Sequence, residues 1–172
     1  MPNIEKASIY TMAKMGNRES FYEKLKFEKK TLEQVKDLYD SQNITLLQHT
    51  IIGRNFDIAK EILYAGVNVN AQNLSGWTAL HYITERQNIE VAKILLEMGG
   101  DINIKEFEYG NTPFMMAVFN CKRTNYELVE LFSKNSPDIS ISNNSGISPL
   151  QFANNIGDEK LIKCLESSNL GE

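Results

Sequence analysis

The sequence is poor in the residues that build disulfide frameworks and metal sites. Its 172 residues include two cysteines and two histidines. Cys121 and Cys164 lie in unlike surroundings and form no Cys-x-x-Cys pair, which argues against a disulfide framework and for a reducing cytoplasm. Neither histidine is paired with a cysteine at ligand spacing, so no zinc or other metal site and no cofactor is predicted.

Long apolar runs are missing as well. No segment approaches the roughly 20 apolar residues that a transmembrane helix needs. Residues 1–6 lack the apolar core of a secretory signal peptide. We therefore expect neither membrane insertion nor export.

The sequence also lacks an excess of positive charge. The formal net charge is −4, which disfavours a general phosphate-binding surface, so nucleic acid is not an expected partner. Residues 1–40 carry eight Lys or Arg and seven Asp or Glu, whereas residues 41–172 carry ten and fifteen. The larger part of the chain is thus the acidic part, which favours a partner with a basic surface.

Catalytic motifs are absent too. The sequence contains no G-x-S-x-G, no P-loop and no G-x-G-x-x-G, and its carboxylates are scattered singly. These absences predict a protein that is not an enzyme. An enzyme on the same scaffold is the alternative, and it would need a hydrolytic activity that depends on His49 or His81.

What the sequence does contain is one pattern that returns every 33 to 36 residues. The clearest copy is G-W-T-A-L-H, with Thr78 at its centre. Thr45 stands 33 residues before Thr78, Thr112 stands 34 after it, and Ser148 a further 36 along. Each anchor can cap a helix and precedes two segments with apolar residues at helical spacing. A fixed period of this kind indicates a repeat array.

The copy at Gly76-Trp77-Thr78, followed by an apolar helix and the turn Gly99-Gly100-Asp101, resembles an ankyrin repeat. This resemblance implies an all-α ankyrin-repeat solenoid of helix-turn-helix units with short β-hairpin fingers, and a structural hydrogen bond for His81. Neighbouring units must stack, because one unit cannot bury its apolar face alone. The expected single domain, residues 1–172, comprises a degenerate capping repeat with a linking helix (1–40), full repeats (41–72, 73–105, 106–142) and a C-terminal capping repeat (143–172).

Two regions depart from the pattern. The first repeat has Ala7 where the others have Thr or Ser, and it lacks the Gly-x-Thr finger. The third full repeat carries one added residue before Gly110 and two more within residues 120–125. The insertions are either tolerated surface loops, since extra loop length costs little, or, for the first, an enlarged finger used for contact.

The resemblance implies that finger residues and exposed positions of the first helices contact partner proteins. The candidate contact residues are Leu74, Trp77, Glu85, Arg86, Phe107, Tyr109, Asn111, Phe119, Asn144 and Ile147. Trp77 and Tyr109 are the candidate anchors, because exposed aromatic residues commonly dominate interfaces. The alternative is that these two rings pack on each other between fingers and stabilise the array.

These observations predict a monomeric, non-enzymatic protein–protein interaction module that binds and neutralises or regulates another protein. Similar stand-alone ankyrin proteins include bacterial immunity proteins that mask a secreted toxin, and acidic repeats suit a basic toxin such as a nuclease. An ankyrin-type effector or regulator of a host or cellular protein would look the same in sequence and is the second interpretation.

Overall fold

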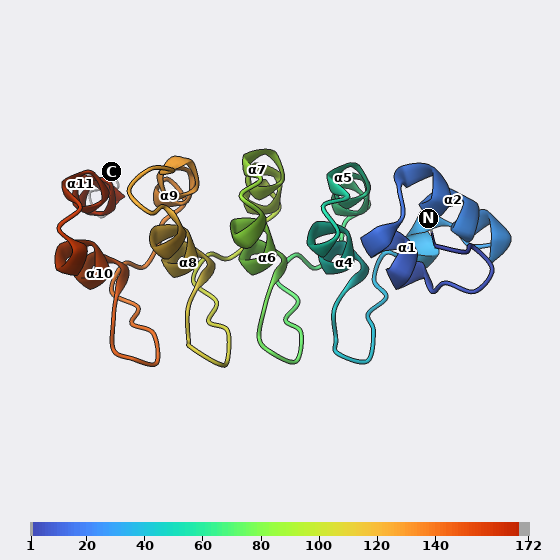
Figure 1. The fold of residues 1–172 in the computed structure, drawn as a ribbon, viewed down its shortest axis with the longest axis horizontal. Coiled ribbons are helices and arrows are strands. Elements are labelled where there is room, and N and C mark those ends of the chain that lie inside the picture. The colour runs from blue at the N-terminus through green and yellow to red at the C-terminus, as the bar shows by residue number, and fades with distance from the viewer. Residues whose placement is uncertain (1, 169–172) are drawn as a thin grey trace.

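The computed structural model describes residues 2–168, where the chain folds as a one-directional stack of helix pairs (Figure 1). The helices are α1 (Ile9–Met15), α2 (Arg18–Phe27), α3 (Leu32–Val35), α4 (Leu46–Ile52), α5 (Phe56–Tyr64), α6 (Ala79–Arg86), α7 (Ile89–Glu97), α8 (Pro113–Asn120), α9 (Glu127–Ser133), α10 (Pro149–Ile156) and α11 (Glu159–Ser168). The all-α solenoid expected from the sequence is confirmed.

Two rows of helices run along the stack. Helices α4, α6, α8 and α10 form the inner row, next to the fingers, and α5, α7, α9 and α11 form the outer row (Figure 1). Within each row, every helix packs on its counterpart in the next pair. This is the arrangement of units that bury their apolar faces only against neighbours.

One apolar core runs through the stack, from Ile9 in α1 to Leu165 in α11. Its largest fully buried side chains are Phe21, Phe114 and Phe132. These rings come from α2, α8 and α9, so the bulkiest buried side chains lie in the first and the fourth helix pair.

The repeat anchors cap the inner helices that follow them, as the sequence predicts. The hydroxyls of Thr45, Thr112 and Ser148 each accept a hydrogen bond from the backbone N–H three residues further on, over 3.1 to 3.3 Å. At Thr78, the backbone N–H donates to Nδ1 of His81 over 3.0 Å. Each inner helix therefore begins directly after its finger with polar groups of its first turn satisfied.

The first helix pair, α1 and α2, has no finger of its own. Ser8 rather than Ala7 occupies the capping position, and its hydroxyl accepts a hydrogen bond from the Thr11 N–H over 3.1 Å. The equivalence drawn from the sequence is thus displaced by one residue, because a hydroxyl can cap a helix and a methyl group cannot. The connection from α2 to Thr45 contains one short helix, α3.

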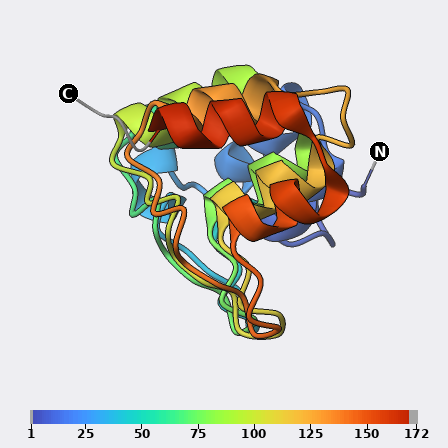
Figure 2. The same ribbon diagram turned by 90° about the vertical axis from the view of Figure 1, so that its left-hand side faces the viewer.

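The fingers are hairpin-shaped loops rather than two-stranded ladders. Within residues 2–168, the only strand pairing is an isolated bridge between Tyr39 and Thr45, so the predicted β-hairpins contain no regular strands. The reason is that each finger is short. One backbone hydrogen bond joins its two arms, as from the Asn73 N–H to the Trp77 carbonyl over 3.1 Å, and other N–H groups of the fingers bond to a side chain or to the neighbouring finger. Figure 2, an end-on view, shows the fingers projecting to one side of the helices and nearly superimposed.

Candidate functional site

One acceptor side chain at the start of each finger holds that finger in shape. In the second finger, Oδ1 of Asn73 accepts hydrogen bonds from the backbone N–H groups of Ser75 and Trp77, both over 2.9 Å. Oδ1 of Asn143 makes the same two bonds in the last finger over 3.0 and 3.1 Å. Oδ1 of Asp40 does so in the first finger over 2.8 and 3.0 Å. The loops are therefore held in one shape rather than left free in solvent.

The third finger is one residue longer, and its anchor is Glu106. One carboxylate oxygen accepts hydrogen bonds from the Tyr109 and Asn111 N–H groups, each over 2.9 Å, and the other accepts one from the Glu108 N–H over 2.8 Å. Glu106 is only 3% exposed. A glutamate reaches one methylene further than an asparagine, so the longer side chain matches the longer loop.

Neighbouring fingers are joined by single backbone hydrogen bonds near their tips. The Leu74 N–H donates to the Gln42 carbonyl over 3.0 Å, and the Phe107 N–H donates to the Ser75 carbonyl over 3.0 Å. A third bond runs from Asn144 to the Tyr109 carbonyl over 2.8 Å. These bonds fix the spacing of the row.

Three apolar side chains stand out from this row. Leu74 is 57% exposed, Phe107 63% and Tyr109 61%. The Phe107 ring lies against the backbone of Gly76, where an added Cβ would come within 2.7 Å of the ring. Hydrogen bonds therefore hold the loops that carry these side chains, and Phe107 also packs on the second finger. Exposed apolar side chains gathered in this way are typical of contact surfaces.

Trp77 lies at the base of the second finger and is half-buried. Its indole ring is 5.0 Å from the ring of Tyr82 and 5.7 Å from that of His81, between centroids. Its ring contacts thus belong to its own repeat, so the alternative in which Trp77 and Tyr109 pack on each other between fingers is wrong. Trp77 also lines a hollow of about 220 Å³ with Asn73, Ser75, Tyr82 and Glu85.

Several other candidate contact residues are engaged within the stack. Nε of Arg86 donates to the Ile52 carbonyl over 3.3 Å, and Nη1 donates to the Glu85 carboxylate over 3.0 Å. The Phe119 ring packs edge-on against Phe152 at 4.5 Å.

The polar finger candidates also link neighbours. Oδ1 of Asn111 accepts from the Asn143 amide over 3.1 Å, and the Asn144 amide donates to the Glu108 carbonyl over 3.0 Å. Ile147 is half-buried in the last finger, and Glu85 is exposed on α6. Some candidates are therefore tip residues open to a partner, and others, such as Arg86, Phe119 and Asn111, hold neighbouring repeats together.

Sequence reasoning missed two residues that shape this surface, Glu106 and Tyr82. Glu106 could have been found by aligning the repeats, since it occupies the same place as Asn73 and Asn143. Tyr82 comes one residue after His81, and its hydroxyl accepts a hydrogen bond from the Asn73 amide over 2.8 Å.

Both histidines have structural surroundings, as expected from the sequence. His81 is fully buried, and burial lowers its pKa from 6.5 to about 4. Because its Nδ1 accepts from the Thr78 N–H, the ring proton is on Nε2, which donates to the Asn111 carbonyl over 3.2 Å. Nε2 of His49 lies 2.9 Å from the Asp40 carboxylate, and burial lowers the pKa of His49.

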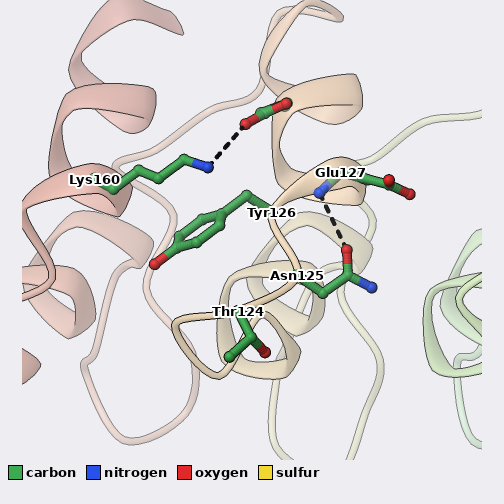
Figure 3. A pocket seen from close by; sticks show the side chains of 6 residues that line it. Thr124, Asn125, Tyr126, Glu127 and Lys160 are labelled. Carbon is green, nitrogen blue, oxygen red and sulfur yellow. Dashed lines mark hydrogen bonds and ion pairs between the residues drawn. The ribbon is translucent and has the colours of Figure 1, made fainter.

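A second hollow, of about 430 Å³, opens between α9 and α11 (Figure 3). Here Nζ of Lys160 lies 4.1 Å from the centre of the Tyr126 ring and 3.6 Å from the Glu130 carboxylate. The Tyr126 hydroxyl donates to the buried Asp158 carboxylate at 2.9 Å. Lys160 and the Tyr126 hydroxyl in this hollow are already paired with other side chains of the chain, so it is not the candidate site.

Other kinds of site find little support in the described part of the chain. Cys121 and Cys164 are free thiols. Over residues 2–168, no three His, Cys, Asp or Glu side chains gather where they could hold a metal ion. No helix in that range is long and apolar enough to cross a bilayer. The row of fingers, the inner helices beside it and the Trp77 hollow together form the candidate site.

A family model of ankyrin repeats in three copies matches residues 12–106 and 46–139. An ankyrin repeat protein of fowlpox virus is 31% identical over 115 residues, which cover 66% of this chain and 19% of the viral protein. An ankyrin repeat-containing protein of Schizosaccharomyces pombe is 30% identical over 112 residues, covering 64% of this chain and 51% of the yeast protein.

A bacterial protein is also similar. Protein PhlB of Serratia liquefaciens is 28% identical over 123 residues, which cover 72% of this chain and 52% of PhlB. The chain thus spans between about one fifth and about half of the length of these three relatives.

Proposed function

Because this chain belongs to the ankyrin repeat family, a family of protein-interaction scaffolds, we propose that it binds one partner protein through its fingers and inner helices and thereby neutralises or regulates that partner without catalysing a reaction. The observation that carries the proposal is the fixed patch of Leu74, Phe107 and Tyr109, each more than half exposed. Loops held in place before binding lose little conformational entropy when a partner covers them.

Charge on the same face favours a basic partner. Glu85 and Glu108 are exposed, and the Glu108 carboxylate beside the Tyr109 hydroxyl raises the pKa of Tyr109. Of the nearby cations, Arg86 donates to the Ile52 carbonyl and to the Glu85 carboxylate, and Lys105 donates to the Ser142 carbonyl. A basic partner would meet carboxylates there, which speeds association and disfavours acidic competitors.

The specific form we put forward is an immunity-type protein that masks a basic toxin encoded beside it. The acidic repeats support this form by charge complementarity, and the remainder is analogy at the level of the fold. A regulator of another cellular protein would use the same surface.

The test is to co-express the chain with the product of the neighbouring gene, purify the complex and measure its affinity by calorimetry. Leu74→Ala with Tyr109→Ala should weaken binding at least about tenfold, because exposed apolar anchors carry much of the affinity of an interface. Tyr64→Ala is the matched control, since Tyr64 is 69% exposed at the end of α5. If the control weakens the complex as much as the double variant, the finger surface is not the interface.

A further inference from the structure

The hollow beside Trp77 combines aromatic rings with a carboxylate. Its lining residues are Asn73, Ser75, Trp77, Tyr82 and Glu85. The planes of the Trp77 and Tyr82 rings are inclined by 48° with their centroids 5.0 Å apart. The Glu85 side chain is 48% exposed.

Charges of both signs act on the Tyr82 hydroxyl in this hollow. Burial raises the pKa of the Tyr82 hydroxyl, and the Glu85 and Asp40 carboxylates raise it further. The Asn73 amide and the Arg86 guanidinium act in the opposite direction. Ring faces of tryptophan and tyrosine attract cations through their quadrupoles, and a carboxylate at the same place adds a charged acceptor.

The second hollow, between α9 and α11, shows that an aromatic ring and a carboxylate of this chain can together hold a cation. There Lys160 lies over the Tyr126 ring at 4.1 Å with the Glu130 carboxylate 3.6 Å from its ammonium group (Figure 3). That hollow has a tyrosine, a glutamate and an internal lysine. The Trp77 hollow has a tyrosine, a tryptophan and a glutamate.

No internal cation fills the Trp77 hollow in the described part of the chain. The cations that lie over aromatic rings within residues 2–168 are Arg18 over Tyr22, Lys24 over Phe27 and Lys160 over Tyr126. Arg86 contacts Glu85 but is only 20% exposed, and its Nε is directed to the Ile52 carbonyl. Glu85 thus keeps nearly half of its side chain open to a ligand.

We propose that the hollow formed by Trp77, Tyr82 and Glu85 binds the cationic side chain of an arginine or lysine from the partner protein. This assignment rests on the proposed function and adds the chemistry of the group that the partner inserts. Trp77 and Tyr82 supply the ring faces, and Glu85 supplies the charge-assisted hydrogen bond.

The binding of a cation can be measured without knowing the partner. Trp77 is the only tryptophan of the chain, so its fluorescence reports on the hollow directly. Titration with Nα-acetyl-arginine amide or Nα-acetyl-lysine amide should give a saturable change. Nα-acetyl-citrulline amide, which has the shape of the arginine probe without its charge, should give none.

Variants test the role of the carboxylate. Glu85→Gln should weaken binding of the cationic probes about fivefold, and Glu85→Lys should abolish it. Glu97→Gln, which removes one exposed carboxylate from the end of α7, controls for net charge and should leave the affinity unchanged. Circular dichroism of each variant checks that the helices are retained.

Two results would overturn the assignment: an equal response to the citrulline probe, or a Glu85→Gln variant that binds the cationic probes like the parent chain. The outcome is separable from that of the proposed function. A complex with a protein partner that tolerates Glu85→Gln would leave the proposed function standing and remove this inference. Specific probe binding by a chain for which no protein partner is found would do the reverse.

Discussion

The second finger, residues 73–78, and the third, residues 106–112, have the same hairpin shape but reach it with different anchors. Asn73 holds two backbone N–H groups of a six-residue loop, whereas Glu106 holds three in a loop of seven residues. The added residue brings one more N–H group to satisfy, and the carboxylate has the reach and the second oxygen to satisfy it. Loop length and anchor length therefore form a matched pair.

The two fingers also depend on each other. The Phe107 ring of the third finger covers Gly76 of the second, and Nε2 of His81, just after the second finger, donates to the Asn111 carbonyl in the third. The exposed patch is thus the product of two neighbouring repeats.

The largest expected effect comes from removing the third anchor. Glu106→Ala leaves three N–H groups around a buried position without their acceptor, and we expect it to lower the free energy of unfolding by about 4 kcal/mol. Asn73→Ala, which removes two such bonds, should cost about 2 kcal/mol. Urea denaturation measures both values, and equal losses would contradict the difference drawn between the anchors.

The next effect is a pH dependence that arises at His81. Its pKa of about 4 in the folded chain lies below the ordinary 6.5, because burial disfavours the charged ring. The unfolded chain therefore binds the proton more readily, and the contribution of His81 to stability is complete above pH 6.5 and is lost as the pH falls from 6.5 towards 4. This difference corresponds to about 3 kcal/mol.

His81→Gln is the variant that isolates this contribution. Gln48 and Gln151 occupy the same place in their repeats, and each accepts the backbone N–H of its capping residue as His81 does. Between pH 6.5 and 4, the free energy of unfolding of the variant should fall less steeply than that of the parent chain, because His81 no longer contributes. The fall that is caused by protonation of carboxylates should remain. An unchanged slope would show that His81 does not titrate across this range.

The sequence was sufficient to predict the stack and its register. Regular spacing from Thr45 to Ser148 identified the inner helices, because the anchor residue types follow from helix capping. The absence of strands in the fingers was not predictable from the motif, since it depends on which groups take the tip N–H bonds. The family is also supported by the match over residues 12–139.

The candidate site was less predictable than the fold. Sequence position places Trp77 in a finger, but it does not show that the Trp77 ring contacts Tyr82 and His81. Glu106 could have been found from the register, yet its role depends on a loop that is one residue longer. The contact role of the candidate residues, Leu74 and Tyr109 included, stays a prediction.

A smaller effect tests the contact between the two fingers. Gly76 has φ +80° and lies under the Phe107 ring, whereas Gly146 has φ +75° with open space around it. Gly76→Ala should cost about 2 kcal/mol, from left-handed backbone strain together with displacement of the ring. Gly146→Ala should cost about 1 kcal/mol, from strain alone. Thermal unfolding of both variants provides the comparison, and equal losses would mean that the Phe107 contact contributes nothing.

The smallest change in stability is expected where both members of the matched pair are exchanged together. Glu106→Asn combined with deletion of Glu108 gives the third finger the length and the anchor of the second. We expect its stability to stay within about 1 kcal/mol of the parent chain, although Glu106→Asn alone leaves at least one N–H unpaired and should cost about 2 kcal/mol. If the losses of stability from the two changes add up in a double-mutant cycle, loop length and anchor length are not matched.

The same combined variant also tests binding. Because the shortened finger moves Tyr109 relative to Leu74, the variant should bind the partner more weakly while remaining folded. This result would separate the shape of the third finger from the stability of the array.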